Sequence, residues 1–207
     1  LTTVMTKEEE ALYEIAAMGI MGLDDDAEEG EVKDWGPRLH DLQRVVDGVH
    51  EPRPVGELNS KEKLLVEAVE KVIGRNEACL IYVEYEDTYN RLNDVLSYRK
   101  DDIGYNNLYM ITGRVPYAER VRIEKHMGKG DIVILTKAGC QSLNLQSANN
   151  VIIYDIPFSV GWFIQVVGRV ARMDSEYEIQ NIVLVEAKDT IDTYKRVLIQ
   201  DHATLIK

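Results

Sequence analysis

The sequence has 207 residues, of which 45% are hydrophobic and 29% charged, with a formal net charge of −12. This length allows one well-buried domain with an appendage, and the longest candidate membrane or signal segment, residues 15–23, is far shorter than the ~20 apolar residues that span a bilayer. Two cysteines, Cys79 and Cys140, are too few for a disulfide scaffold or a cysteine-based zinc site, so we expect an intracellular, reducing compartment, the cytoplasm in preference to the nucleus.

Residues 1–58 are predicted to form a small acidic helical segment. Apolar positions at helical spacing predict helices over 7–22 and 38–49, and the run of acidic residues between them, 24–30, is typical of a solvated linker. A Pro-x-Pro sequence then ends the second helix, because proline cannot continue it. The first 60 residues hold 15 acidic and 5 basic residues, a net charge of −10. We place a domain boundary near residue 58 and expect this segment to pack against the main domain as a protrusion.

The main domain, residues 59–207, alternates short apolar runs with helical patterns. Ser60 is the predicted N-cap of its first helix, over 61–74. Runs rich in Ile, Val and Tyr predict strands over 79–85, 108–112, 132–136, 151–154 and 182–185. Further helices are predicted over 87–98, 116–127, 158–172 and 188–199. Apolar strands separated by helices are typical of a parallel sheet covered on both faces, so we predict one α/β domain.

Ligands of such sheets gather beyond the carboxyl ends of the strands. The loop after the third predicted strand, residues 136–145, is the longest candidate, because its small residues let a ligand backbone approach closely. The window 113–140 holds six basic and three acidic residues, a net charge of +3, whereas residues 61–207 as a whole carry −2. One face of the main domain is therefore expected to suit a phosphate backbone.

The stretch from Gly161 to Arg172 predicts an amphipathic helix with a narrow polar stripe. Gln165, Arg169 and Arg172 lie at positions i, i+4 and i+7 and share one face, opposite a face of apolar residues. No acidic residue lies three or four positions from Arg169. Planar guanidinium groups bind phosphate oxygens bidentately and stay charged at physiological pH. The stripe therefore predicts a polyphosphate ligand, and solvated surface arginines are the alternative interpretation.

Together these stretches resemble the C-terminal RecA-like lobe of superfamily 2 helicases and translocases. Gln-x-x-Gly-Arg-x-x-Arg at 165–172 resembles motif VI, and residues 79–85 and 136–145 resemble motifs IV and V. Thr112-Gly113 is similar to the strand-end turn that touches the nucleic-acid backbone in that family. Leu-Asn-Leu at 143–145, followed by Ala-Asn-Asn-Val-Ile-Ile-Tyr-Asp, resembles the Swi/Snf-like branch. The resemblance covers roughly residues 60–200 and implies a RecA-like parallel sheet with helices on both faces.

The resemblance also implies roles for individual residues. Arg172 would be the arginine finger and Arg169 a second phosphate contact, while Asn144 would contact the nucleotide sugar. Gln165 would link the nucleotide state to closure of the lobes, and Gly168 and Gly139 would also lie at the nucleotide. The expected nucleic-acid contacts are Thr112, Gly113, Arg114, Thr136, Lys137 and Ala138.

Two motifs of a complete motor do not occur in the sequence. It has no Gly-x-x-x-x-Gly-Lys-Ser/Thr and no Asp-Glu-x-His-type motif after an apolar strand. We therefore expect a piece of a longer protein that is inactive alone, with ATP and Mg²⁺ held mainly by an N-terminal RecA-like lobe of the same protein. The expected partners are that lobe and double-stranded DNA, with no membrane, and residues 1–50 are not expected to bind DNA.

Three alternatives stay open. An RNA helicase lobe fits most of the pattern, although Asn144 stands where RNA-dependent members commonly have an aspartate. A non-catalytic interaction module would keep the fold and use residues 1–60 as a binding arm. A nucleotide-binding α/β enzyme unrelated to motors is disfavoured, because no Gly-x-Gly-x-x-Gly turn follows any predicted strand.

Overall fold

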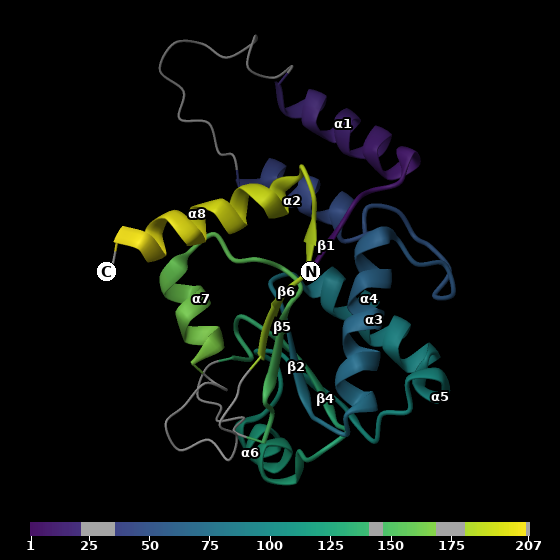
Figure 1. The fold of residues 1–207 in the computed structure, drawn as a ribbon, viewed down its shortest axis with the longest axis vertical. Helices are drawn as coiled ribbons and strands as arrows, with labels where there is room; N and C mark the ends of the chain where they lie inside the picture. The colour runs from purple at the N-terminus through teal and green to yellow at the C-terminus, as the bar shows by residue number, and fades with distance from the viewer. Residues whose placement is uncertain (22–35, 141–146, 169–180, 206–207) are drawn as a thin grey trace.

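The computed structural model describes residues 1–21, 36–140, 147–168 and 181–205. Within these residues, five parallel strands form the main sheet in the order β3-β4-β2-β5-β6 (Figure 1). All five predicted strands are present, and each observed end lies within two residues of the predicted one. Their bounds are β2 (Cys79–Val83), β3 (Leu108–Ile111), β4 (Ile132–Thr136), β5 (Asn150–Ile153) and β6 (Asn181–Leu184).

Helices cover both faces of this sheet, as predicted. Figure 1 shows α3, α4 and α5 on one side of it and α7 on the other. The helices of the first side are α3 (Ser60–Gly74), α4 (Glu86–Tyr98) and the short α5 (Lys100–Ile103). Those whose side chains pack on the opposite face are α6 (Tyr117–His126), α7 (Val160–Val167) and α8 (Ile191–Leu205). Helix α5 was not predicted, and α7 begins at Val160, two residues later than predicted.

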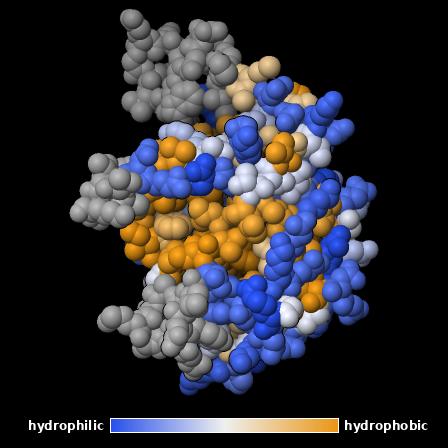
Figure 2. Space-filling view, viewed as in Figure 1, coloured by the Kyte–Doolittle hydropathy of each residue, from blue (hydrophilic) through white to orange (hydrophobic). Residues whose placement is uncertain are grey.

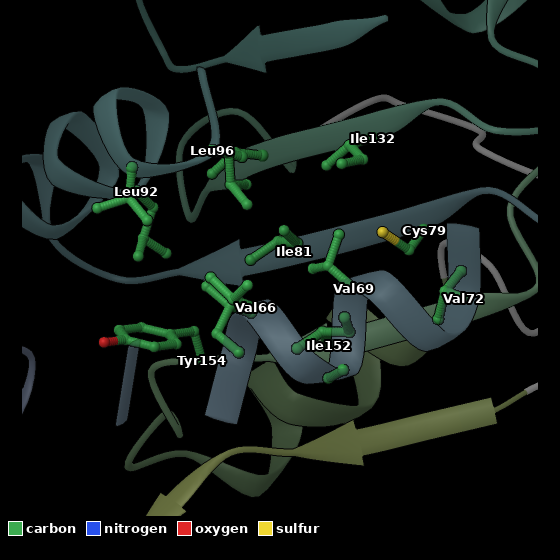
Figure 3. Close-up of a cluster of buried hydrophobic side chains, with 14 of the residues drawn as sticks. Val66, Val69, Val72, Cys79, Ile81, Leu92, Leu96, Ile132, Ile152 and Tyr154 are labelled. Carbon is green, nitrogen blue, oxygen red and sulfur yellow. The ribbon is translucent and has the colours of Figure 1, made fainter. Parts of the chain in front are cut away.

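The strands separate two hydrophobic clusters because successive side chains point to opposite faces. Ile81 belongs to the cluster under α3 and α4, whereas its neighbour Tyr82 belongs to the cluster under α6 and α7. Figure 3 shows Val66 and Val69 of α3 directed toward Ile81 of β2 and Ile152 of β5. A strand that is buried on both faces has no solvent-facing side where polar residues would be favoured, which explains the continuous apolar runs.

The N-terminal residues pack against the main domain through α8 and an added strand pair. Strand β1 (Thr2–Thr3) pairs in parallel with β7 (Glu186–Ala187), and neither was predicted. Helix α1 (Lys7–Met21) contacts α2 (Gly36–Val46), which in turn packs on α8. The prediction extended α2 to residue 49, but the helix ends at Val46, since Gly48 adopts a left-handed φ of 74°. The acidic run 24–30 lies outside the described residues.

Helix α3 begins with a capping box centred on Asn59, so the predicted N-cap at Ser60 is wrong by one residue. The Asn59 side chain accepts a hydrogen bond from the Glu62 backbone at 2.7 Å, and the Glu62 carboxylate accepts one from the Asn59 backbone at 2.8 Å. Ser60 instead donates its hydroxyl to Glu9 of α1 at 2.7 Å. This contact joins the N-terminal segment to the main domain across the predicted boundary at residue 58.

Figure 2 shows hydrophobic side chains gathered on the face of the molecule where α7 and β6 lie, below α8. The exposed large hydrophobic residues of these three elements include Ile164, Ile182 and Val197, which are 56%, 45% and 41% exposed. Strand β6 is an edge of the described sheet, which leaves its outer side without a neighbouring strand of that sheet.

Among the described helices, none has the length and hydrophobicity needed to cross a bilayer.

Candidate nucleic-acid interface

The structure brings all six predicted nucleic-acid contacts together in one open pocket of about 510 Å³. The pocket lies at the carboxyl ends of β2, β3 and β4, three neighbouring strands of the sheet. Two acidic residues that were not among the predicted contacts complete the pocket. The lining residues are Glu84, Glu86, Thr112, Gly113, Arg114, Thr136, Lys137 and Ala138.

Two threonines occupy equivalent positions at the base of the pocket. The register of β3 and β4 pairs Ile111 with Leu135, so Thr112 and Thr136 follow at the same level on adjacent strands. The Thr112 hydroxyl oxygen accepts the Arg114 backbone N–H at 3.2 Å, and that of Thr136 accepts the Gly139 backbone N–H at 3.3 Å. Each hydroxyl therefore keeps its own hydrogen to donate to an anionic ligand.

Two glycines allow the loops after β3 and β4 to approach each other closely. A Cβ atom on Gly113 would lie 2.8 Å from the Cβ of Ala138, which is closer than real Cβ contacts. A Cβ on buried Gly139 would clash with the backbone carbonyl of Ile111. The need for glycine at position 139 is thus explained by packing, and its predicted contact with the nucleotide stays a prediction.

Arg120 of α6 braces the loop that follows β3. Its guanidinium donates to the carbonyl oxygens of Thr112 and Gly113 at 3.0 Å and to that of Val115 at 2.8 Å. Arg120 is one of the six cations in the basic window 113–140, and Arg122, another, is paired with Glu119 at 2.7 Å. Much of the predicted positive charge in this window is therefore engaged within the protein.

The two cations of the pocket are each paired with one of its carboxylates. Lys137 lies 3.6 Å from Glu84, and Arg114 lies 3.0 Å from Glu86. Both cationic side chains are largely exposed, at 54% for Lys137 and 83% for Arg114, whereas Glu84 is 19% exposed. The formal charges of the pocket balance, in contrast to the net positive face that the sequence predicted.

A buried cluster of charged residues contacts the pocket through the backbone of Glu84. Its members come from the end of α2, the start of α3, the end of β5 and the start of α8, and they are Asp47, Lys61, Asp155, Asp192 and Lys195. Asp155 accepts the backbone N–H of Glu84 at 2.8 Å, which fixes the position of that pocket residue.

The ionisation of this cluster is set by its burial. Burial and the neighbouring Asp47 carboxylate raise the pKa of Asp155 well above its usual range. Burial opposes the charge on Lys61, but Asp192 and Asp47 outweigh it and raise the pKa of that ammonium group. For Lys195, burial dominates and lowers the pKa. No local sequence pattern could have found this cluster, because its members are scattered along the chain.

The residues predicted to face a nucleotide are only partly described. Gln165 is exposed on α7, and Gly168 is the C-cap of that helix. Val166 is buried in the sheet-facing cluster, which confirms the predicted apolar face of α7. Asn144, Arg169 and Arg172 lie outside the described residues, so their roles stay predictions. Within the described ranges, no group of three or more His, Cys, Asp or Glu residues could hold a metal ion.

The parallel sheet, its two helical layers and the pocket at the strand ends define the class of RecA-like α/β lobes. Residues 60–174 match the model of the helicase conserved C-terminal domain, and the chain belongs to this family. A comparison with curated proteins gave no match.

Solved structures with the same fold include parts of the Fun30 ATPase and of a SWI2/SNF2 ATPase. The C-terminal part of the Fun30 ATPase domain is 15% identical with a TM-score of 0.71, over 96% of this chain and 87% of that one. The SWI2/SNF2 ATPase core of Sulfolobus solfataricus in complex with dsDNA is 21% identical with a TM-score of 0.72, over 97% of this chain and 44% of that one. The C-terminal domain of the S. solfataricus ATPase is 19% identical with a TM-score of 0.65, over 97% and 86%. The predicted helicase C-terminal lobe is confirmed by the family match, and its predicted RecA-like fold by the likeness to these structures.

Proposed function

We propose that this chain is the second motor lobe of an ATP-dependent double-stranded DNA translocase and that its pocket binds the DNA backbone. The observation that carries the proposal is the convergence of all six expected contact residues on one pocket. The S. solfataricus SWI2/SNF2 core, which shares this fold, was solved with dsDNA. This chain covers less than half of that core. We therefore propose that ATP-driven movement requires a second lobe in addition to this one.

The chemistry of the pocket suits phosphate better than base edges. Threonine hydroxyls, an ammonium group and a guanidinium group all donate hydrogen bonds to phosphate oxygens. Two cations that neutralise two phosphates give a salt dependence of log K with a slope of about −2. Binding through this pocket should therefore be independent of DNA sequence and weaken as the salt concentration rises.

In the proposed motor, ATP supplies the free energy for movement and is held mainly by the N-terminal lobe with Mg²⁺. Arg172 would stabilise the charge that develops on the transferred phosphoryl group, and Arg169 would add a second phosphate contact. Gln165, which is exposed on α7, belongs to the same predicted polar stripe as these two arginines and lies within the described residues. Gly168 and Asn144 complete the proposed nucleotide contacts.

The proposal is tested by reversing one charge in the pocket. Lys137→Glu should weaken binding of a labelled DNA duplex at low salt, by the same factor for two unrelated sequences. Lys129→Glu is the matched control, because exposed Lys129 precedes the amino end of β4 and lies at the opposite end of that strand. Equal affinity of the Lys137→Glu variant and the parent would refute the proposed interface.

A further inference from the structure

Four side chains beside the pocket form a closed ring, which we call the Lys137 ring. The indole N–H of Trp162 donates to the Tyr82 hydroxyl at 2.7 Å, and that hydroxyl donates to Glu84 at 3.4 Å. Glu84 is paired with Lys137 at 3.6 Å, and the Lys137 ammonium lies 5.1 Å from the centre of the Trp162 ring. The ring joins the end of β2, the loop after β4 and helix α7.

Three members of the Lys137 ring are held in place, and one can move. Tyr82 is fully buried, and burial together with the charge of Glu84 raises its pKa, so its hydroxyl stays a donor. Asp155 holds the Glu84 backbone, and Trp162 packs against the cluster under α7. Lys137 has a long side chain that is 54% exposed. It is therefore the member that can change partner.

A phosphate in the pocket would compete with both present partners of Lys137. Both contacts are made by a largely exposed ammonium group and are weak, so exchanging them for a phosphate oxygen costs little. When the ammonium group leaves, the face of the Trp162 ring loses its cation, and the donor chain from Trp162 to Glu84 ends on an unpaired carboxylate. Occupancy of the pocket would thus change the contacts of α7.

Trp162 connects the Lys137 ring to the polar residues of α7. It lies in the first turn of α7, where Ser159 accepts its backbone N–H at 3.4 Å. Gln165 follows at i+3, on the neighbouring surface of the helix, and the sequence continues the polar stripe to Arg169 and Arg172.

We propose that Trp162 is a positioning residue that couples phosphate binding by Lys137 to helix α7 and to the stripe that is predicted to face a nucleotide. The inference rests on the proposed function of the pocket as a DNA-backbone site. It adds the residue through which occupancy of that site reaches the polar stripe of α7.

Trp162 fluorescence provides a direct test. The sequence has two tryptophans, so Trp35→Phe leaves Trp162 as the single emitter. A DNA duplex is titrated at low salt while binding is followed separately by the anisotropy of a labelled duplex. We expect a saturable change in Trp162 emission that follows the binding curve. In Lys137→Met, or Lys137→Gln if the first variant folds poorly, saturating DNA should leave the emission unchanged.

Each outcome separates the two proposals. Binding without a change in emission overturns the coupling and leaves the DNA interface standing. A change that persists in the Lys137 variants also overturns the coupling, because it then has another cause. Absence of binding in the Trp35→Phe protein overturns both.

A second measurement tests the competition between Glu84 and phosphate. Glu84→Gln still accepts the Tyr82 hydrogen bond but no longer neutralises Lys137, so its Kd for the duplex should fall about two- to five-fold. Glu77→Gln is the control, since it breaks the 2.8 Å pair with Arg75 before the amino end of β2 with the same change in net charge. An unchanged Kd in Glu84→Gln, or an equal fall in the control, contradicts the competition.

Discussion

The ammonium group of Lys61 lies 2.9 Å from the carboxylate of Asp192, which ties the first turn of α3 to the first turn of α8. The same group lies 2.8 Å from Asp47 at the end of α2. All three side chains are almost completely buried. One cation thus connects the consecutive helices α2 and α3 to the distant α8. Its loss would leave two buried carboxylates without this partner.

Lys61→Ala should lower the free energy of unfolding by about 3–5 kcal/mol, because removing one partner of a buried pair leaves an uncompensated charge. Urea unfolding followed by circular dichroism measures this. Lys63→Ala, on the exposed face of the same helix, is the control and should change stability by about 0.5 kcal/mol or less. Similar losses in both variants would show that the buried pairs contribute little.

Gly139→Ala should lower the free energy of unfolding by about 1–3 kcal/mol, since the new Cβ forces the loop after β4 away from Ile111. The displaced loop carries Lys137 and Ala138, so duplex affinity should fall as well. Gly74→Ala is the matched control, because a Cβ at the end of α3 meets no atom within 4 Å and should stabilise the helix by about 0.5–1 kcal/mol. A Gly139→Ala protein with parental stability and affinity would contradict the close packing.

The raised pKa of Asp155 makes stability depend on pH. An acid whose pKa is higher in the folded state binds more protons when folded, so its contribution falls as the pH rises above the unfolded value of about 3.9. Asp155→Asn removes this penalty and keeps an oxygen for the Glu84 backbone N–H. The stability of the variant minus that of the parent should therefore grow as the pH rises from about 4.5 to about 8.5. The free energies of unfolding are measured by urea unfolding. If the difference between variant and parent is constant with pH, burial does not shift the pKa of Asp155.

This chain alone should not hydrolyse ATP, and Arg172 should become essential only with the other lobe present. In the two-lobed protein, an arginine finger is typically worth about 10³–10⁵ in rate. Arg172→Lys and Arg169→Ala should bind DNA normally and lose most DNA-stimulated turnover, because lysine lacks the planar fork. Steady-state ATPase rates with saturating duplex decide this. Turnover within a few-fold of the parent would show that the helix does not face the nucleotide.

Deleting residues 1–50 should lower the thermal midpoint and leave DNA affinity intact. The deletion removes β1, α1, α2 and Asp47, which pack on β7 and α8, while every pocket residue is retained. Thermal unfolding and duplex anisotropy are measured on the same preparation. Loss of DNA binding at an unchanged midpoint would place the DNA contact in the N-terminal segment instead.

The five strands of the main sheet were predictable because each is a short run rich in apolar residues, and β2, β4 and β5 are buried on both faces. The pair β1 and β7 was not, since two residues are too few to carry a period. The one-residue error at Asn59 has a specific cause. Asn and Ser are both good N-caps, and the choice between them is made by Glu62, which stands three residues after Asn59.

The six pocket residues were predictable because they follow the carboxyl ends of adjacent parallel strands. Their partners were not. Glu84 neutralises Lys137 from a different strand, and Trp162 reaches the pocket from α7, so only the packing of these elements reveals either contact. The charged cluster around Lys61 was hidden for the same reason. The roles of Asn144, Arg169 and Arg172 stay predictions.

The central position of β2 also constrains how the protein is made. Both neighbours of β2, strands β4 and β5, follow it in the sequence, with β3 and three helices or more in between. A growing chain on the ribosome therefore exposes both edges of an apolar strand until residue 136 has emerged, and one of them until residue 153. Such non-local pairing slows folding. Unpaired apolar edges recruit other chains. Truncation between residues 83 and 132 should consequently yield a product that aggregates or requires a chaperone.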